Sequence, residues 1–193
     1  YAGTCRFILS CNYSSKIIEP IQSRCAVFRF RPLAEDQILE MVQEVAESEG
    51  LVLENHGAAA VVHVAMGDLR RAITALQVAA SLSNTITRDL VYETTATAPP
   101  EELHAFLRSC QEDGFQPSRM KMYAIIDRFG LAGTDIVNQL HRSLADVQFM
   151  TEREKLAVTE AMAEADFRLV EGGGESLQLD ALTARISTIL KIN

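Results

Sequence analysis

Apolar residues recur every three or four positions over most of the chain after Pro32, which is the spacing of an amphipathic helix. Asn55 is placed to cap a helix that runs to about Val64, and Gly67 to end it. We expect helices throughout this part and a compact five-helix bundle beyond residue 100. The stripes that predict them are Ile38, Val42 and Val45; Leu69, Ile73, Leu76 and Ala80; Leu103, Phe106, Leu107 and Cys110; Ile125, Ile126 and Phe129; Ile136, Leu140, Leu144 and Val147; Leu156, Ala163, Phe167 and Val170; and Leu179, Leu182, Ile186 and Leu190.

The first 31 residues have a different pattern. Residues 5–10 and 26–30 are short runs of β-type residues, and the second run alternates aromatic with basic side chains. The serine pair between them can cap a short helix over about residues 17–22. The segment is therefore predicted to contain a strand, a turn, a helix and a second strand.

The net charge changes along the chain and suggests where it divides. Residues 1–32 carry a net charge of +4, residues 33–97 a net charge of −7 and residues 98–193 a net charge of −5, for a total of −8. Pro99 and Pro100 do not continue a helix, because proline lacks an amide donor and restricts the residue before it. These changes predict three domains, at residues 1–31, 32–97 and 98–193.

Composition narrows the class of protein. With 193 residues and 48% hydrophobic content, the chain is long enough to bury a core in one or two domains. Its longest apolar runs fall well short of the roughly 18 residues that a membrane span requires, so no membrane partner is expected. The net negative charge and the absence of Trp argue against a broad cationic surface for nucleic-acid phosphates. Because the chain opens on Tyr1 without an initiator Met, we expect it to begin inside a longer protein.

Candidate chemistry is sparse. The chain has no G-x-x-x-x-G-K-[ST], G-x-G-x-x-G, H-E-x-x-H or G-x-S-x-G motif, so we expect no phosphate cradle and no metal site in it. Its cysteines lack metal-type spacing, and we interpret them as small core residues of a protein in a reducing cytoplasm. Its histidines are expected to be ordinary helix residues. These residues are Cys5, Cys11, Cys25 and Cys110, and His56, His63, His104 and His141.

Residues 4–25, TCRFILSCNYSSKIIEPIQSRC, closely resemble the small subunit of the archaeal and eukaryotic replication factor C clamp loader, an AAA+ ATPase. The resemblance implies a mostly α fold: the C-terminal end of an AAA+ α/β core over 1–31, a small helical lid over 32–97 and a helical collar over 98–193. The family's phosphate-binding loop and Mg²⁺-binding acidic box would lie upstream of Tyr1. The similarity continues through residues 28–30, 67–73, 94–99, 166–169 and 177–180, and so covers essentially the whole chain.

Three polar residues gain roles from this resemblance. Asn12 corresponds to sensor 1, near the γ-phosphate and the attacking water; taken alone, it would be a simple turn former. Arg24 corresponds to the arginine finger that reaches the nucleotide of the adjacent subunit, whereas a bland interpretation makes it a surface arginine paired with an acid. Arg70 corresponds to sensor 2, which contacts the nucleotide of its own subunit. Arg71 is the weaker candidate, since its side chain points about 100° away, and Asp68 is placed to cap the helix.

The resemblance also implies cofactors and partners. The complete protein would use ATP with Mg²⁺ to load a sliding clamp onto primer–template DNA, in the cytoplasm or, in a eukaryote, the nucleus. It would assemble with other small and large clamp-loader subunits through the collar. Helices beyond residue 100 have apolar residues in excess of one narrow stripe, such as Leu144, Val147, Phe149 and Met150, which suggests a surface for that association.

Two other functions compete with this one. The chain can be a helical oligomerisation scaffold without a nucleotide role, or part of a different AAA+ protein, such as a bacterial clamp-loader subunit or a helicase loader. A scaffold has no use for Arg24 and Arg70 at these positions, and the strings Ser-Cys-Asn-Tyr and Ser-Arg-Cys favour replication factor C. Because the phosphate cradle is missing, we expect this portion alone to need no cofactor and to be inactive as an ATPase.

Overall fold

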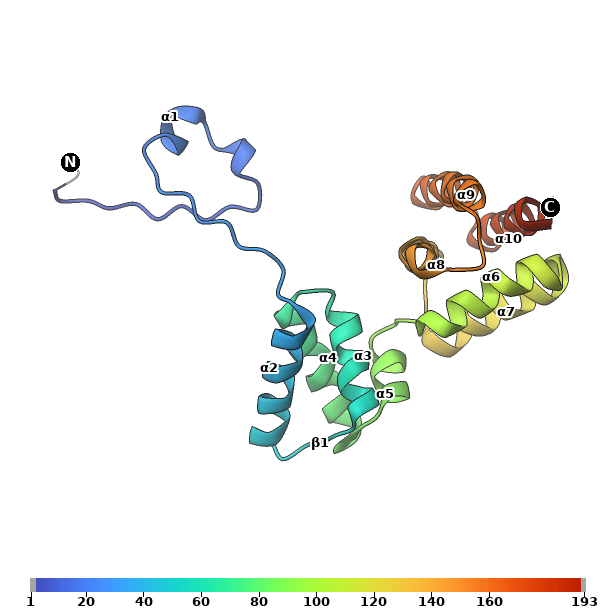
Figure 1. The fold of residues 1–193 in the computed structure, drawn as a ribbon, viewed down its shortest axis with the longest axis horizontal. Helices are drawn as coiled ribbons and strands as arrows, with labels where there is room; N and C mark the ends of the chain where they lie inside the picture. The colour runs from blue at the N-terminus through green and yellow to red at the C-terminus, as the bar shows by residue number, and fades with distance from the viewer. Residues whose placement is uncertain (1–2, 192–193) are drawn as a thin grey trace. The chain divides into compact units, whose positions relative to one another are not determined.

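The computed structural model describes residues 3–191, most of which are helical (Figure 1). Residue contacts divide the chain after Pro32 into two units, Tyr1–Pro32 and Leu33–Asn193, which are described separately here. The predicted division near residue 97 falls inside the second unit and stays a prediction. The mostly helical fold class is confirmed.

The first unit contains two short helical turns, η1 (Ser14–Lys16) and α1 (Glu19–Gln22). The side-chain amide of Gln22 joins them, donating hydrogen bonds to the carbonyl oxygens of Ser14 at 2.8 Å and Ile17 at 2.6 Å. The helix predicted over residues 17–22 thus begins later, at Glu19, the residue before Pro20.

The two strands predicted in this unit are not formed. Residues 5–10 and 26–30 have no strand partner, and their apolar side chains face solvent, with Ile8 99% and Phe30 97% exposed. A β-strand is stabilised by ladder hydrogen bonds and by burial of one face, and neither is available to these residues here. Three of the cysteines expected in a core, Cys5, Cys11 and Cys25, are exposed for the same reason, whereas Cys110 is buried.

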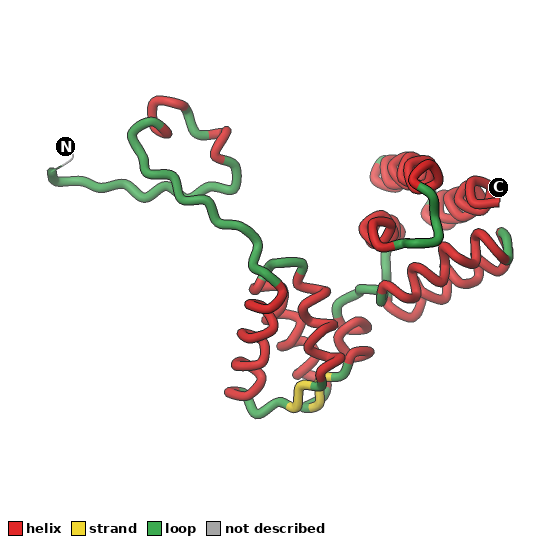
Figure 2. Tube along the Cα trace, in the orientation of Figure 1, coloured by secondary structure: helices red, strands yellow, loops and turns green. Residues whose placement is uncertain are grey.

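The second unit begins with four helices and a strand pair that the helical pattern did not reveal (Figure 2). Two-residue strands are too short to show alternation, which explains why they were missed. Residue Val52 pairs with Thr85, and Leu53 with Ile86, in parallel register. The elements are α2 (Glu35–Ser48), β1 (Val52–Leu53), α3 (Asn55–Ala65), α4 (Leu69–Leu82), β2 (Thr85–Ile86) and α5 (Arg88–Thr94); the last helix lies in the part expected to be helical, although no apolar stripe marked it.

The ends of α3 differ slightly from expectation. Glu54 rather than Asn55 occupies the N-cap position, and Asn55 is the first helical residue. At the other end, Met66 and Gly67 both have positive φ angles, 50° and 82°, so the chain turns away from the helix there as predicted. Ile38 and Val42 of α2 are buried in the core that these helices share.

The five helices predicted beyond residue 100 are confirmed. Helix α10 lies against α9, α6 and α7, and Arg119 and Tyr123 of α7 hold it through Asp180, with Nε–Oδ1 2.7 Å and Oη–Oδ1 3.1 Å. The helices are α6 (Pro100–Glu112), α7 (Phe115–Phe129), α8 (Gly133–Ser143), α9 (Glu152–Val170) and α10 (Glu175–Lys191), with a short turn η2 (Leu144–Asp146) after α8.

The apolar residues proposed for self-association are not available for it. Leu144, Val147 and Met150 are buried, and Phe149 packs partly buried against the same core. They follow α8 as a turn and loop that fold back onto the bundle, so an excess over a helical stripe did not mean exposure. The earlier assignment of these four residues to an interface is wrong.

One close backbone approach generates a stability prediction. A Cβ atom added to Gly57 of α3 would lie 2.2 Å from the carbonyl oxygen of Ile86 in β2. The Gly57→Ala variant should therefore be destabilised by about 1–3 kcal/mol, the usual cost of overpacking. Urea unfolding followed by circular dichroism measures this. Gly174→Ala is the control, since a Cβ there meets open space, and an equal shift in both variants would contradict the clash.

Candidate nucleotide-contact residues and subunit surface

Asn12 and Arg24 both lie on the exposed surface of the first unit. Asn12 occupies a bend directly before Tyr13, the N-cap residue of η1. Arg24 follows α1, and its Nη1 donates a hydrogen bond to the carbonyl oxygen of Pro20 at 2.7 Å. Its recorded hydrogen bond is thus to a carbonyl of its own short helix, not to a carboxylate as the surface ion-pair interpretation expects.

Arg70 is the second residue of α4, and its side chain is exposed. The predicted cap of this helix is confirmed: Asp68 Oδ1 accepts the backbone N–H of Arg70 at 2.9 Å and that of Arg71 at 3.4 Å. Ala72 and Leu76 of the same helix are buried. Because one face of α4 is packed and its first turn is capped, the backbone that carries Arg70 has a defined position within the second unit.

The proposed arrangement of these residues around one nucleotide stays a prediction. Asn12 and Arg24 belong to the first unit and Arg70 to the second, and each unit is defined by its own contacts. What the structure does establish is local: Arg24 follows the short helix α1, Arg70 lies in the capped first turn of α4, and both side chains are exposed.

Two surface depressions of the second unit are each lined by a single arginine and no lysine. One, of about 450 Å³, lies beside the start of α3 and α5 and is lined by Glu54, Asp89 and Glu101 together with His56, Thr87 and Arg88. Three carboxylates there would repel a phosphate. Within residues 3–191, no cluster of three His, Cys, Asp or Glu side chains is arranged to hold a metal ion, and no helix is both long and apolar enough to cross a bilayer.

The structure reveals an exposed apolar surface that sequence reasoning placed in the core. Leu156, Phe167 and Val170 of α9 are 66–71% exposed, and Leu177 of α10 is 68% exposed. We call these four residues the α9 stripe. The predicted core face of α9 is therefore wrong: this helix has a second apolar face, and that second face is the buried one. That face consists of Val158, Ala161, Met162 and Ala165.

Residues 98–185 match the family described as the replication factor C C-terminal domain. The whole chain is also similar to longer proteins. It is 48% identical over 184 residues to a replication factor C small subunit of Methanocella arvoryzae, an alignment that covers 95% of this chain. The chain belongs to the replication factor C small-subunit family.

Other archaeal relatives agree. The chain is 42% identical over 189 residues to a replication factor C small subunit of Methanococcus maripaludis, and 42% identical over 196 residues to that of Methanosarcina acetivorans. The alignments cover 98% and 97% of this chain. The chain spans only 57–60% of the length of these three relatives and corresponds to their C-terminal portion.

These similarities confirm the resemblance to a clamp-loader subunit over the alternatives of an unrelated helical scaffold or a different AAA+ protein. Helices α6–α9 and the first part of α10 lie within the matched replication factor C domain. The roles of individual residues are a separate question, because a family match does not test them.

The cap of α4 generates a prediction about the position of Arg70. Replacing Asp68 with Ala removes the acceptor of two N–H groups in the first turn and should cost about 1 kcal/mol of stability. Asp68→Asn is the matched variant, because an asparagine oxygen can accept the same hydrogen bonds. Thermal unfolding of the three proteins measures the difference; equal losses in both variants would show that the charge of Asp68, not its capping bond, stabilises the helix.

Proposed function

We propose that this chain is the C-terminal portion of a clamp-loader small subunit. In the complete protein, ATP binding and hydrolysis with Mg²⁺ would drive loading of a ring-shaped sliding clamp onto primer–template DNA in the cytoplasm. The observation that carries this proposal is the 48% identity to a replication factor C small subunit across 95% of the chain. In this proposal residues 1–31 are the C-terminal end of the AAA+ core, and the phosphate cradle and Mg²⁺ site would belong to a part of the complete protein that these residues do not include.

Asn12 is proposed as the sensor 1 residue. An amide can orient the attacking water or contact the γ-phosphate without adding charge to the site. Its exposed position in a bend, after an extended run, is compatible with delivery to a neighbouring ligand. In an open α/β sheet, ligands bind at the carboxyl ends of strands, and residues 5–10 are the extended run that would supply this end.

Arg24 is proposed to act in trans, on the nucleotide of an adjacent subunit. A guanidinium has five N–H donors in a planar fork and stays charged, which suits bidentate contact with phosphate oxygens. The hydrogen bond of Nη1 to Pro20 holds the side chain against α1 while leaving other donors free for a partner. Its exposure is what a residue that reaches another subunit requires.

Arg70 is proposed to act in cis, on the nucleotide of its own subunit. It lies in the first turn of the 14-residue helix α4, where the helix dipole adds a positive potential to that of the guanidinium. Both favour an anionic ligand. The hydrogen bonds that Asp68 accepts hold this turn in place. The position of the Arg70 backbone therefore depends on α4, which is packed within the second unit.

The α9 stripe is proposed as part of the surface through which the collar contacts other clamp-loader subunits. Four large apolar side chains that are each about two-thirds exposed are costly in water and are typical of a covered surface. Three of them lie on one face of α9, and Leu177 lies in the first turn of α10. A stable subunit contact buries on the order of 1,600 Å² in total, so the stripe would form the apolar centre of a larger contact.

The full-length oligomer distinguishes the roles of Arg24 and Arg70. Arg24→Ala leaves each subunit's own site intact, so nucleotide affinity should change little while hydrolysis falls by about 10³-fold or more. Arg70→Ala should weaken nucleotide binding as well. Calorimetry and steady-state ATPase assays measure the two effects, and Arg31→Ala, another exposed arginine of the first unit, is the control.

Mixing subunits tests whether Arg24 acts in trans. Arg24→Ala subunits are combined with subunits whose phosphate-loop lysine is replaced, so that some mixed rings pair an intact cradle with an intact Arg24. ATPase activity should then partly recover. If activity stays absent despite demonstrated subunit exchange, Arg24 has a structural role and the trans assignment is wrong.

The α9 stripe is tested by assembly. Phe167→Asp should weaken subunit association by at least about tenfold, because a charge in an apolar contact is left without a partner. Sedimentation of the full-length subunits measures this. Met120→Asp is the matched control, since Met120 of α7 is 71% exposed but lies outside the stripe. Equal association of wild type and Phe167→Asp would exclude the stripe as a subunit contact.

A further inference from the structure

One side chain of α8 holds the backbone that leads from α5 into α6. Gln139 accepts a hydrogen bond from the N–H of Ala98 at 2.8 Å, through Oε1, and donates one to the carbonyl oxygen of Ala96 at 3.1 Å, through Nε2. The oxygen and the nitrogen of this amide are therefore both bound to the linker between α5 and α6, at backbone groups two residues apart. Helices α2–α5 precede this linker and helices α6–α10 follow it. The contact of Gln139 supports the direction in which the chain passes from the first group to the second.

The backbone of the linker has a disfavoured conformation at Ala96. Ala96 has a φ angle of 46°, in the left-handed region that residues with a Cβ atom rarely adopt. Such a conformation persists where surrounding contacts impose it. Ala98 is fully buried, and the N–H of Thr97 donates to the carbonyl oxygen of Tyr92 at 3.2 Å. Gln139 thus stabilises a turn that alanine disfavours.

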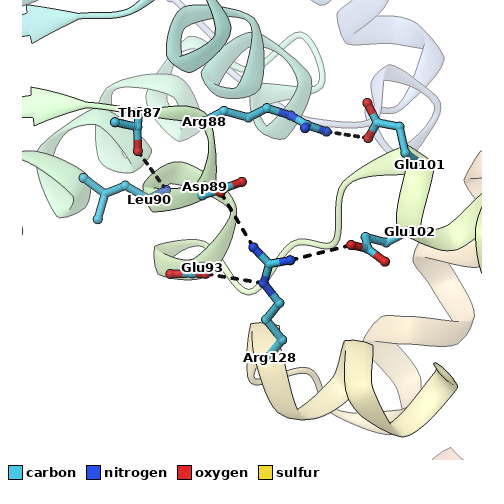
Figure 3. A network of polar contacts seen from close by, with 8 residues as sticks. All are labelled: Thr87, Arg88, Asp89, Leu90, Glu93, Glu101, Glu102 and Arg128. Carbon is cyan, nitrogen blue, oxygen red and sulfur yellow. Dashed lines mark hydrogen bonds and ion pairs between the residues drawn. The ribbon is translucent and has the colours of Figure 1, made fainter. Parts of the chain in front are cut away.

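A second polar contact crosses the same junction (Figure 3). Arg128 of α7 faces Asp89 and Glu93 of α5, with nitrogen–oxygen distances of 3.7 and 3.5 Å, and also Glu102 of α6 at 3.6 Å. One guanidinium therefore bridges carboxylates from both sides of the linker. Beside it, Arg88 of α5 pairs with Glu101 of α6.

The three ion pairs of Arg128 are weak by their geometry and exposure. Arg128 and the three carboxylate side chains around it are 41–65% exposed, and the distances exceed those of charge-assisted hydrogen bonds. Exposed pairs are screened by salt and each contributes little. Residues of both helix groups and Ala98 between them also belong to one buried apolar core, so these polar contacts are the part of the junction that salt or a single substitution can break.

We propose that Gln139 and Arg128 form a polar latch that holds α2–α5 in one orientation on α6–α10. When the latch is released, α2–α5 turn about residues 95–97 while both helix groups keep their folds. The inference concerns this chain alone and does not depend on the proposed ATPase cycle. It would let a change at the Arg70 end of the molecule alter the orientation of the helices that carry the α9 stripe.

Spin-label distance measurements on the 193-residue chain test the latch. One label at Glu44 of α2 and one at Glu171, after α9, report on the junction; pairs Glu44/Gln77 and Gln116/Glu171 report within each group. Each labelled site is changed to Cys after Cys5, Cys11 and Cys25 are replaced by Ser; Cys110 is buried and kept. Excess unlabelled chain suppresses distances between molecules.

We expect Gln139→Ala and Arg128→Ala each to broaden the distance distribution across the junction at least twofold, with both within-group distributions unchanged. Wild type should broaden when salt is raised from about 0.05 to 0.5 M, since the Debye length falls severalfold. Asn138→Ala is the control for α8, because the amide of Asn138 bonds within that helix to Thr134. Arg108→Ala is the control arginine, stacked on Phe149 within the collar.

Three results would overturn the proposal. The first is an unchanged junction distance in both latch variants. The second is a wild-type distribution already as broad as that of the variants, since the latch would then not be closed. The third is broadening within α6–α10 as well, which would make Gln139 and Arg128 supports of the collar fold and not of its orientation.

Discussion

Each helix of the second unit can bury one face, and this constraint decides which side chains remain for function. Helix α9 shows it most directly, because it carries two apolar faces. The face with Val158, Ala161, Met162 and Ala165 packs inside, where smaller side chains permit close approach, and the face with Phe167 and Val170 is left outside. The exposed apolar surface of α9 is thus a consequence of which of its two apolar faces packs in the core.

The same constraint explains where the charged candidates lie. Arg70 shares α4 with buried Ala72 and Leu76, so packing of that helix holds the backbone of its first turn, and Asp68 completes the turn through capping bonds. Arg24 has no comparable core beneath it. A hydrogen bond to Pro20 and the amide of Gln22 organise its surroundings locally, which suits a residue whose proposed partner is another subunit.

One apolar core continues through both groups of helices, and polar contacts are added to it where the groups meet. Inside, large apolar residues such as Phe106 and Ile38 are fully buried. At the junction, buried Ala98 is accompanied by one amide contact and several exposed carboxylate–guanidinium pairs, and a residue in the left-handed region marks the turn. Apolar cores are stable to modest changes in salt, whereas exposed ion pairs are not, so the orientation of the groups is the property most open to regulation.

The amino-acid sequence by itself determined the helical class, the five helices after residue 100, the cap at Asp68 and the family, because periodicity, capping residues and long motifs are local signals. Tertiary structure alone decided the rest. It selected which apolar face of α9 is buried, folded Leu144 and Val147 back into the core and paired the two-residue strands β1 and β2. It also left residues 5–10 and 26–30 unpaired and brought Gln139 to Ala96 and Ala98, 43 and 41 positions away in sequence. Such choices depend on contacts between residues far apart in the chain, which no local pattern encodes.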